Sequence, residues 1–188
     1  MKKRYFAIPI LAVALHFLLS NLLYFLVERL VLDVFHIPPQ QFMNYSYWGE
    51  ILIYAVLILV FFTLYKLLWR KEISEPRTAT NFKDVLGSLV VGFGICGISG
   101  LWIMLAEQFP SLQKSVEAMN AGAENIVGGN AFGTFMIAVI AAPVVEEILF
   151  RGIVLRSMRK FTPAWAAILI SSVLFGVYHL NIVQAAYA

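Results

Sequence analysis

Long, nearly unbroken runs of apolar residues dominate the pattern along this chain of 188 residues. Each run is about twenty residues long, the length that an α-helix needs to cross the hydrocarbon core of a bilayer. Membrane-spanning β-strands instead alternate apolar and polar residues over about ten positions. The runs therefore predict an all-α, polytopic bundle of about five transmembrane helices, over residues 5–27, 51–68, 85–106, 131–150 and 163–188.

Composition supports a lipid bilayer as the surroundings of this bundle. Hydrophobic residues make up 61% of the chain and charged residues 13%, whereas soluble domains carry about 25% charged residues. We find no repeat and no second domain, so residues 1–188 are interpreted as a single membrane domain. The basic residues are divided among short connections and form no clustered basic stretch of the kind that would indicate nucleic-acid binding.

The distribution of basic residues predicts how the bundle is oriented. Twelve of the 14 Lys and Arg residues lie at the N-terminus, in the connection 66–83, or just after the fourth run. The other two connections contain only Arg29 and Lys114. Cytoplasmic connections of membrane proteins carry an excess of Lys and Arg. We therefore expect the N-terminus to be cytoplasmic and the C-terminus to lie on the opposite side.

Two adjacent carboxylates interrupt the fourth apolar run, at Glu146 and Glu147. A carboxylate at membrane depth costs at least about 2.5 kcal/mol unless it is paired or hydrated. Arg151 follows Glu147 by four residues, the favourable order for an ion pair on a helix. Glu146 points about 100° away and stays available for another partner. Pro143 permits a kink just before the pair. The competing interpretation is that both carboxylates snorkel at a helix end.

A histidine in the fifth run is the second candidate. The fourth and fifth runs are expected to form a hairpin that turns near Phe161. Glu146 lies about 22 Å of helix before this turn and His179 about 27 Å after it, so both are expected at similar depth. Phe175 lies four residues before His179, on the same helix face. A carboxylate and an imidazole together can hold and deprotonate a water; polar helix packing is the alternative role for His179.

Glu146-Glu147-x-x-x-Arg151 followed by Phe175-x-x-x-His179 resembles the first two motifs of the CAAX-protease and bacteriocin-processing (Abi) family of intramembrane endopeptidases. The resemblance covers residues 131–188. It implies proteolysis of peptides or membrane-tethered proteins, in bacterial members in the plasma membrane and with processing or immunity roles for small peptides such as bacteriocins. Glu146 would activate the water, Glu147 and Arg151 would support it, and His179 would orient the water or bind the oxyanion.

The resemblance leaves the metal open, because the family is described both with zinc and as a glutamate-only peptidase. Glu146 and His179 would be the ligands if zinc binds, but a catalytic zinc usually takes three protein ligands. The family also carries a later His followed by Asn or Asp, and His179 is nine residues from the end of this sequence. We therefore expect the 188-residue chain to insert into membranes but to lack a complete catalytic site.

Two other functions compete with the peptidase. A non-catalytic membrane immunity or binding protein would keep the fold without the chemistry. A proton-coupled transporter component would use Glu146, Glu147 and His179 as a relay, and it predicts further polar groups in other spans, where His16 and Asn21 are the candidates.

The charge distribution predicts the topology. Single-cysteine labelling from either side of the membrane should place Lys71 and Arg159 in the cytoplasm and Lys114 outside. Finding Lys114 on the same side as Arg159 would contradict the five-span arrangement.

Overall fold

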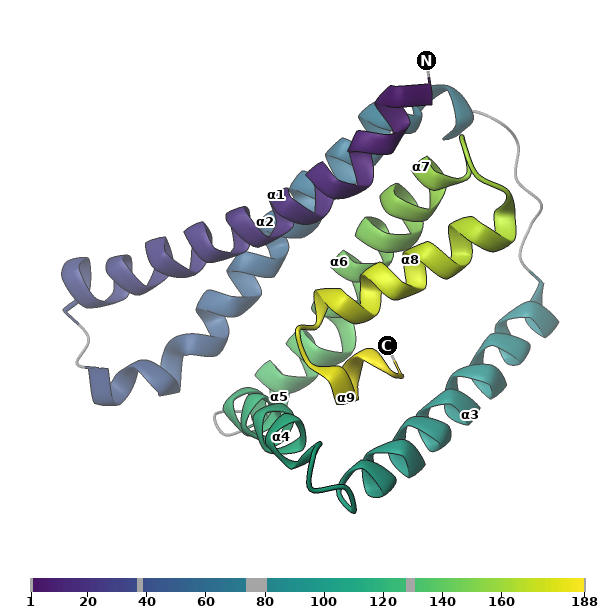
Figure 1. Cartoon of the computed structure of the whole chain (residues 1–188). Helices are drawn as coiled ribbons and strands as arrows, with labels where there is room; N and C mark the ends of the chain where they lie inside the picture. The colour runs from purple at the N-terminus through teal and green to yellow at the C-terminus, as the bar shows by residue number, and fades with distance from the viewer. Residues whose placement is uncertain (1, 37–38, 74–80, 128–130, 188) are drawn as a thin grey trace. The chain divides into compact units, whose positions relative to one another are not determined.

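The computed structural model describes residues 2–36, 39–73, 81–127 and 131–187, and within them every regular element is a helix. Three of these helices are long and apolar enough to cross a membrane: Tyr5–Val34, Tyr47–Lys71 and Phe82–Ala106 (Figure 1). They confirm the all-α class and the first three expected spans. Their length and composition make the chain an integral membrane protein.

The chain divides into two compact units. Unit 1 comprises Met1–Leu68 and Gly122–Ser172, and unit 2 comprises Trp69–Ala121 and Val173–Ala188. Two of the boundaries, after Ala121 and after Ser172, fall inside helices. The third, after Leu68, falls where the helix Pro39–Ile73 is kinked, because Trp69 has the non-helical dihedrals φ −117° and ψ 22°. The expectation of a single membrane domain stays a prediction.

Unit 1 contains two long N-terminal helices that run antiparallel. α1 (Lys2–Arg29) continues into the short π-helical segment η1 (Leu30–Val34), and α2 spans Pro39–Ile73. The ring of His16 lies 5.7 Å from the ring of Phe61. Further along α1, Val27 approaches Gly49 so closely that an added Cβ there would lie 2.7 Å from Val27 Cγ1. Positions later in α1 thus meet positions earlier in α2.

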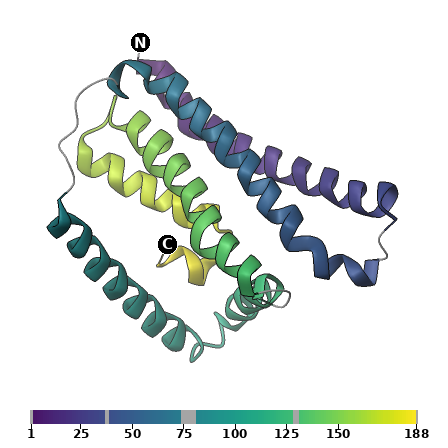
Figure 2. The same ribbon diagram turned by 180° about the vertical axis from the view of Figure 1, so that it is seen from behind.

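The third helix of unit 1 is a composite of five consecutive elements without an interruption. They are α5 (Ala131–Thr134), η2 (Phe135–Ala141), α6 (Ala142–Glu146), η3 (Glu147–Leu155) and α7 (Arg156–Met158); η2 and η3 are π-helical. The rising green ribbon in Figures 1 and 2 shows this continuity from α5 to α7. The expected fourth span is therefore a helix, and it extends to Met158.

Pro143 explains where the helix widens. Proline lacks the backbone N–H that would bond to the carbonyl four residues earlier. Just before it, the N–H of Ala142 bonds to the carbonyl of Ile137, five residues back. Ala141 and Ala142 nevertheless keep right-handed helical dihedrals. The kink that the sequence permits is thus taken up as π-helical turns, which occur frequently at functional sites.

The composite helix lies against α2, and the two run parallel. Gly133 faces Tyr47 near the start of both helices, and Gly152 faces Tyr65 near their other ends. Glycine permits both approaches: an added Cβ would lie 2.8 Å from Tyr47 Cβ at the first position and 3.1 Å from Tyr65 Cδ2 at the second. Parallel packing is what the second and fourth spans of a serpentine bundle require.

Unit 2 is built on α3 (Phe82–Ala106), α4 (Gln113–Val127, the part up to Ala121) and the C-terminal residues. An Asn81–Asp84 capping box begins α3. The buried centre of the unit brings Ala106 and Val116 together with Val183 of the C-terminal segment. Trp102 Nε1 also donates to the carbonyl of Val183 at 2.9 Å.

The expected fifth span is shorter than predicted. α8 spans Ala164–Tyr178, and a separate short helix, α9, spans Ile182–Ala185. Between them Leu180 has a φ of 52°, a left-handed value that is uncommon for a bulky residue. Asn181 stabilises the break: its side chain accepts from the N–H groups of Val183 and Gln184 and donates to the carbonyl of Ser115 at 2.7 Å. The prediction of one helix through Ala188 is wrong for this reason.

Gly133 offers a direct test of the packing between α2 and the composite helix. Gly133→Ala should lower the midpoint of thermal unfolding, because overpacking a tight contact costs about 1–3 kcal/mol. Gly97→Ala is the matched control, since an added Cβ there meets nothing within 4 Å; it should be neutral or stabilising. Unfolding of the detergent-solubilised protein can be followed by tryptophan fluorescence. Equal midpoints for the two variants would contradict the contact.

Candidate functional site

The two adjacent glutamates differ in their surroundings. Glu146, the last residue of α6, is half-buried, whereas Glu147, the first residue of η3, is exposed. Val145 beside them is buried and fixes which face of the helix packs inward. The two carboxylates therefore point in different directions, as their helical spacing predicts.

Glu147 forms the predicted ion pair with Arg151. Its Oε1 lies 3.1 Å from Arg151 Nη1, and both side chains are largely exposed. An exposed pair of this spacing contributes little stability in water, but in an apolar environment it removes the cost of leaving Glu147 charged and alone. Glu147 and Arg151 thus neutralise one another.

A polar group from another helix lies near Glu146. Tyr54, half-buried on α2, interacts electrostatically with Glu146 and also with Glu50, and Tyr24 on α1 interacts with Glu50 and Tyr54. The sequence analysis did not include Tyr24, Glu50 or Tyr54. Glu50 and Tyr54 are four residues apart and share a face of α2. The pair of polar residues at the start of this apolar span was the sequence signal that could have identified Glu50 and Tyr54.

His179 lies just beyond the last residue of α8, in unit 2. Its backbone N–H donates to the carbonyl of Gly176 at 3.2 Å. The rings of Phe175 and His179 meet edge to face at 4.7 Å, as their shared face predicts. His179 therefore belongs to the turn that the left-handed Leu180 and the Asn181 cap complete.

The hydrogen bond of the ring defines what His179 can do. Nδ1 lies 2.8 Å from the carbonyl oxygen of Phe175. A carbonyl only accepts, so Nδ1 must carry the proton, and in the neutral ring Nε2 is then a hydrogen-bond acceptor. A neutral His179 is suited to orienting a water; it can donate to an oxyanion from Nε2 only after it is protonated.

The predicted residues fall in different units: Glu146, Glu147 and Arg151 in unit 1, Phe175 and His179 in unit 2. The structure brings Glu147 to Arg151 and Phe175 to His179. The expectation that Glu146 and His179 meet at similar depth stays a prediction. His16, a candidate polar group of the transporter alternative, is buried and its ring lies 5.7 Å from the ring of Phe61.

A zinc site was tested against the donor residues. Within each unit, the described residues bring no three His, Cys, Asp or Glu side chains together as a metal-binding group. Catalytic zinc usually takes three protein ligands and one open position. Neither unit by itself supplies that ligand set, so no catalytic step is derived through a metal.

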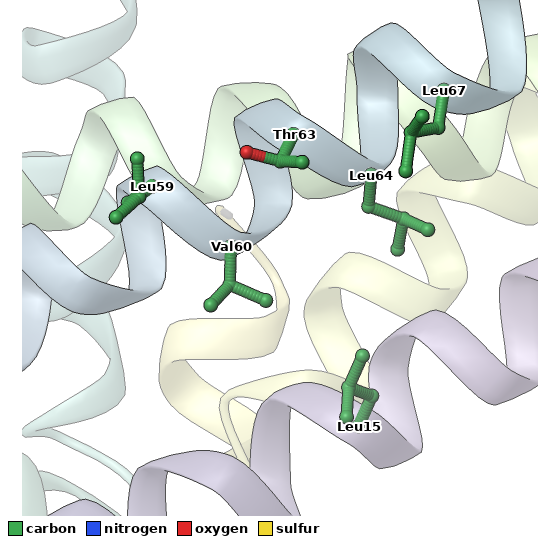
Figure 3. Close-up of a pocket in the computed structure, with 6 residues that line it drawn as sticks. All are labelled: Leu15, Leu59, Val60, Thr63, Leu64 and Leu67. Atoms are coloured by element: carbon green, nitrogen blue, oxygen red, sulfur yellow. The ribbon is translucent and has the colours of Figure 1, made fainter.

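A groove of about 340 Å³ between α1 and α2 is separate from the acidic residues. Leu15 of α1 and five α2 residues line it (Figure 3): Leu59, Val60, Thr63, Leu64 and Leu67. Thr63 supplies the only side-chain oxygen of this lining. Because the groove contains no acid or base, its lining suits hydrocarbon chains rather than catalysis.

Comparison with known proteins agrees with the resemblance seen in the motifs. Residues 128–188 match the family model described as type II CAAX prenyl endopeptidase Rce1-like. No curated protein and no solved structure matches the chain. The matched segment contains both acidic residues, Arg151, Phe175 and His179. Over residues 128–188 the chain is therefore similar to the CAAX prenyl endopeptidases, and the resemblance to the CAAX-protease and bacteriocin-processing family is confirmed there.

Proposed function

We propose that this protein is an intramembrane endopeptidase of the CAAX-protease type that cleaves peptides or membrane-tethered proteins with water activated by Glu146. The observation that carries the proposal is the family match over residues 128–188, because it includes both motifs on which the chemistry depends. The bilayer is its surroundings, and we propose the bacterial plasma membrane as its location.

Glu146 is the better base of the two glutamates. Arg151 already pairs with Glu147 at 3.1 Å, whereas Glu146 is half-buried and lies near Tyr54 of another helix. In the proposed step Glu146 takes a proton from water, the resulting hydroxide attacks the peptide carbonyl, and Glu146 returns the proton to the leaving amine.

His179 is proposed as the residue that orients this water. With Nδ1 donating to Phe175, the Nε2 lone pair can accept one hydrogen of the water while Glu146 accepts the other. This role requires Glu146 and His179 to meet at one water. The sequence predicts that they lie at similar depth, because they are about 22 and 27 Å of helix from the hairpin turn. The ion pair of Glu147 and Arg151 leaves no net charge next to Glu146 on this helix.

Glu146→Gln should lower cleavage by at least about 100-fold, because general-base catalysis contributes about 10²–10⁴. The substrates are an isoprenylated CAAX-ended peptide and an unmodified apolar peptide, incubated with reconstituted protein and analysed by mass spectrometry. Glu117→Gln, an exposed glutamate on α4, is the matched control. Cleavage by Glu146→Gln at the control rate would exclude Glu146 as the base.

His179→Gln tests the second role. Glutamine has no imidazole ring, so the variant loses the contact with Phe175 that orients the acceptor nitrogen Nε2. Cleavage should therefore fall by at least about tenfold with insertion unchanged. His36→Gln, an exposed histidine that follows η1, is the control and should cleave normally. A loss of folding in His179→Gln, seen as an altered gel-filtration profile, would instead point to a structural role.

A further inference from the structure

Three arginines and a tyrosine line a pocket of about 150 Å³ in unit 1. It lies at the end of the composite helix, where the basic residues after the fourth apolar run are located. Its walls are formed by η3 and α7 together with Tyr65 of α2: Arg151, Gly152, Leu155, Arg156 and Arg159. All of these residues belong to unit 1. Apart from Arg151, which pairs with Glu147, the residues of this pocket have no role in the proposed peptidase chemistry.

The π-helical geometry explains why the arginines converge. On an ordinary α-helix Arg151 and Arg156, five residues apart, would point about 140° away from each other. In a π-helix the backbone bonds run between residues five apart, so such residues lie above one another. Both arginines flank or lie within η3 (Glu147–Leu155), and the widened turns bring them toward one wall. Arg159 follows Arg156 by three residues, one turn further.

Tyr65 fixes the middle arginine in position. Arg156 Nη1 donates to the Tyr65 hydroxyl at 3.0 Å, and its guanidinium lies 5.7 Å from the centre of the Tyr65 ring. Gly152 allows this tyrosine to approach the helix backbone, since an added Cβ would lie 3.1 Å from Tyr65 Cδ2. Tyr65 thus holds the Arg156 guanidinium at the pocket, and Gly152 leaves the space that Tyr65 needs.

The charges in the pocket are not balanced. Glu147 pairs with Arg151, and no acidic residue lines the pocket itself. Basic residues that only set the topology need to be exposed on one side of the membrane, but they do not need to converge on one cavity. An anion in the pocket would offset the repulsion between the guanidinium groups of Arg156 and Arg159.

We propose that this pocket binds the phosphate group of an anionic phospholipid in the cytoplasmic leaflet. Arginine forks match the oxygens of phosphate, and basic pockets between transmembrane helices on the cytoplasmic side bind lipid headgroups. The charge distribution predicts that Arg159 is cytoplasmic.

The test measures thermal unfolding of the purified full chain in detergent against added phosphatidylglycerol, phosphatidylcholine or inorganic phosphate. Phosphatidylglycerol should raise the wild-type midpoint saturably, and phosphatidylcholine should not. Arg156→Gln/Arg159→Gln should raise the half-saturating concentration at least about tenfold. Arg70→Gln/Lys71→Gln is the matched control: it removes two charges on the same predicted side but outside the pocket, and it should shift that concentration less than about threefold.

The two anions distinguish the source of the phosphate. Protection by phosphatidylglycerol alone, lost in the pocket variant, supports a lipid headgroup. Protection by inorganic phosphate with the same dependence on Arg156 and Arg159 supports the site but identifies a soluble phosphate as its ligand. Equal weakening in the pocket and control variants, or no protection by either anion, would overturn the proposal.

Arg159→Gln alone provides a second variant, because Arg156 also holds Tyr65 and its loss can disturb packing. This single change should weaken phosphatidylglycerol binding about fivefold and leave the lipid-free midpoint close to that of the wild type. A lipid response identical to wild type in a folded Arg159→Gln protein would remove Arg159 from the site and overturn the three-arginine pocket.

Discussion

The ion pair between Glu147 and Arg151 allows two carboxylates to occupy adjacent positions on an otherwise apolar helix. A lone charge at membrane depth is costly, and two adjacent carboxylates would also repel one another. At 3.1 Å, Arg151 neutralises Glu147. Glu146 is half-buried near Tyr54, and it is the carboxylate that we propose as the base. The proposal thus gives one glutamate a structural role and the other a chemical role.

The widened turns around this pair have two effects. They absorb the missing hydrogen bond at Pro143 without breaking the helix, so the acidic pair stays on a continuous element that packs against α2. They also change which residues share a face: η3 directs Arg151 and Arg156 to one pocket and places Gly152 against Tyr65. The helix that carries the candidate base thus also carries a basic pocket nearer the predicted cytoplasmic surface.

Much of the fold follows from the apolar pattern. The three long helices, the turn near Phe161, the Glu147–Arg151 pair and the contact of Phe175 with His179 depend on spacing along one helix, which the sequence states directly. The end of α8 does not follow, because the apolar run gives no stop at Tyr178. That break depends on the left-handed Leu180 and on the bond from Asn181 to Ser115, which is 66 residues away in the chain.

The parts of the candidate site that the sequence missed are contacts between helices. Tyr54 near Glu146 and Tyr65 on Arg156 are decided by how α2 packs, and no spacing along one helix encodes them. The π-helical turns were also missed, because they are defined by backbone hydrogen bonds between residues five apart and not by a pattern of side chains. Proline at position 143 was the one local signal that pointed to them.

The central claim is that Glu146 and His179 act on the same water. Cross-linking of Glu146→Cys/His179→Cys with a short bismaleimide, in a Cys96→Ser background, measures their proximity in the membrane-reconstituted chain. Trypsin cuts between the two positions at Arg151, Arg156, Arg159 and Lys160, so mass spectrometry can identify the joined peptides. The account predicts a joined peptide in the double variant and none in either single variant. A folded double variant whose two thiols both react with a monofunctional maleimide, but never become joined, would contradict it.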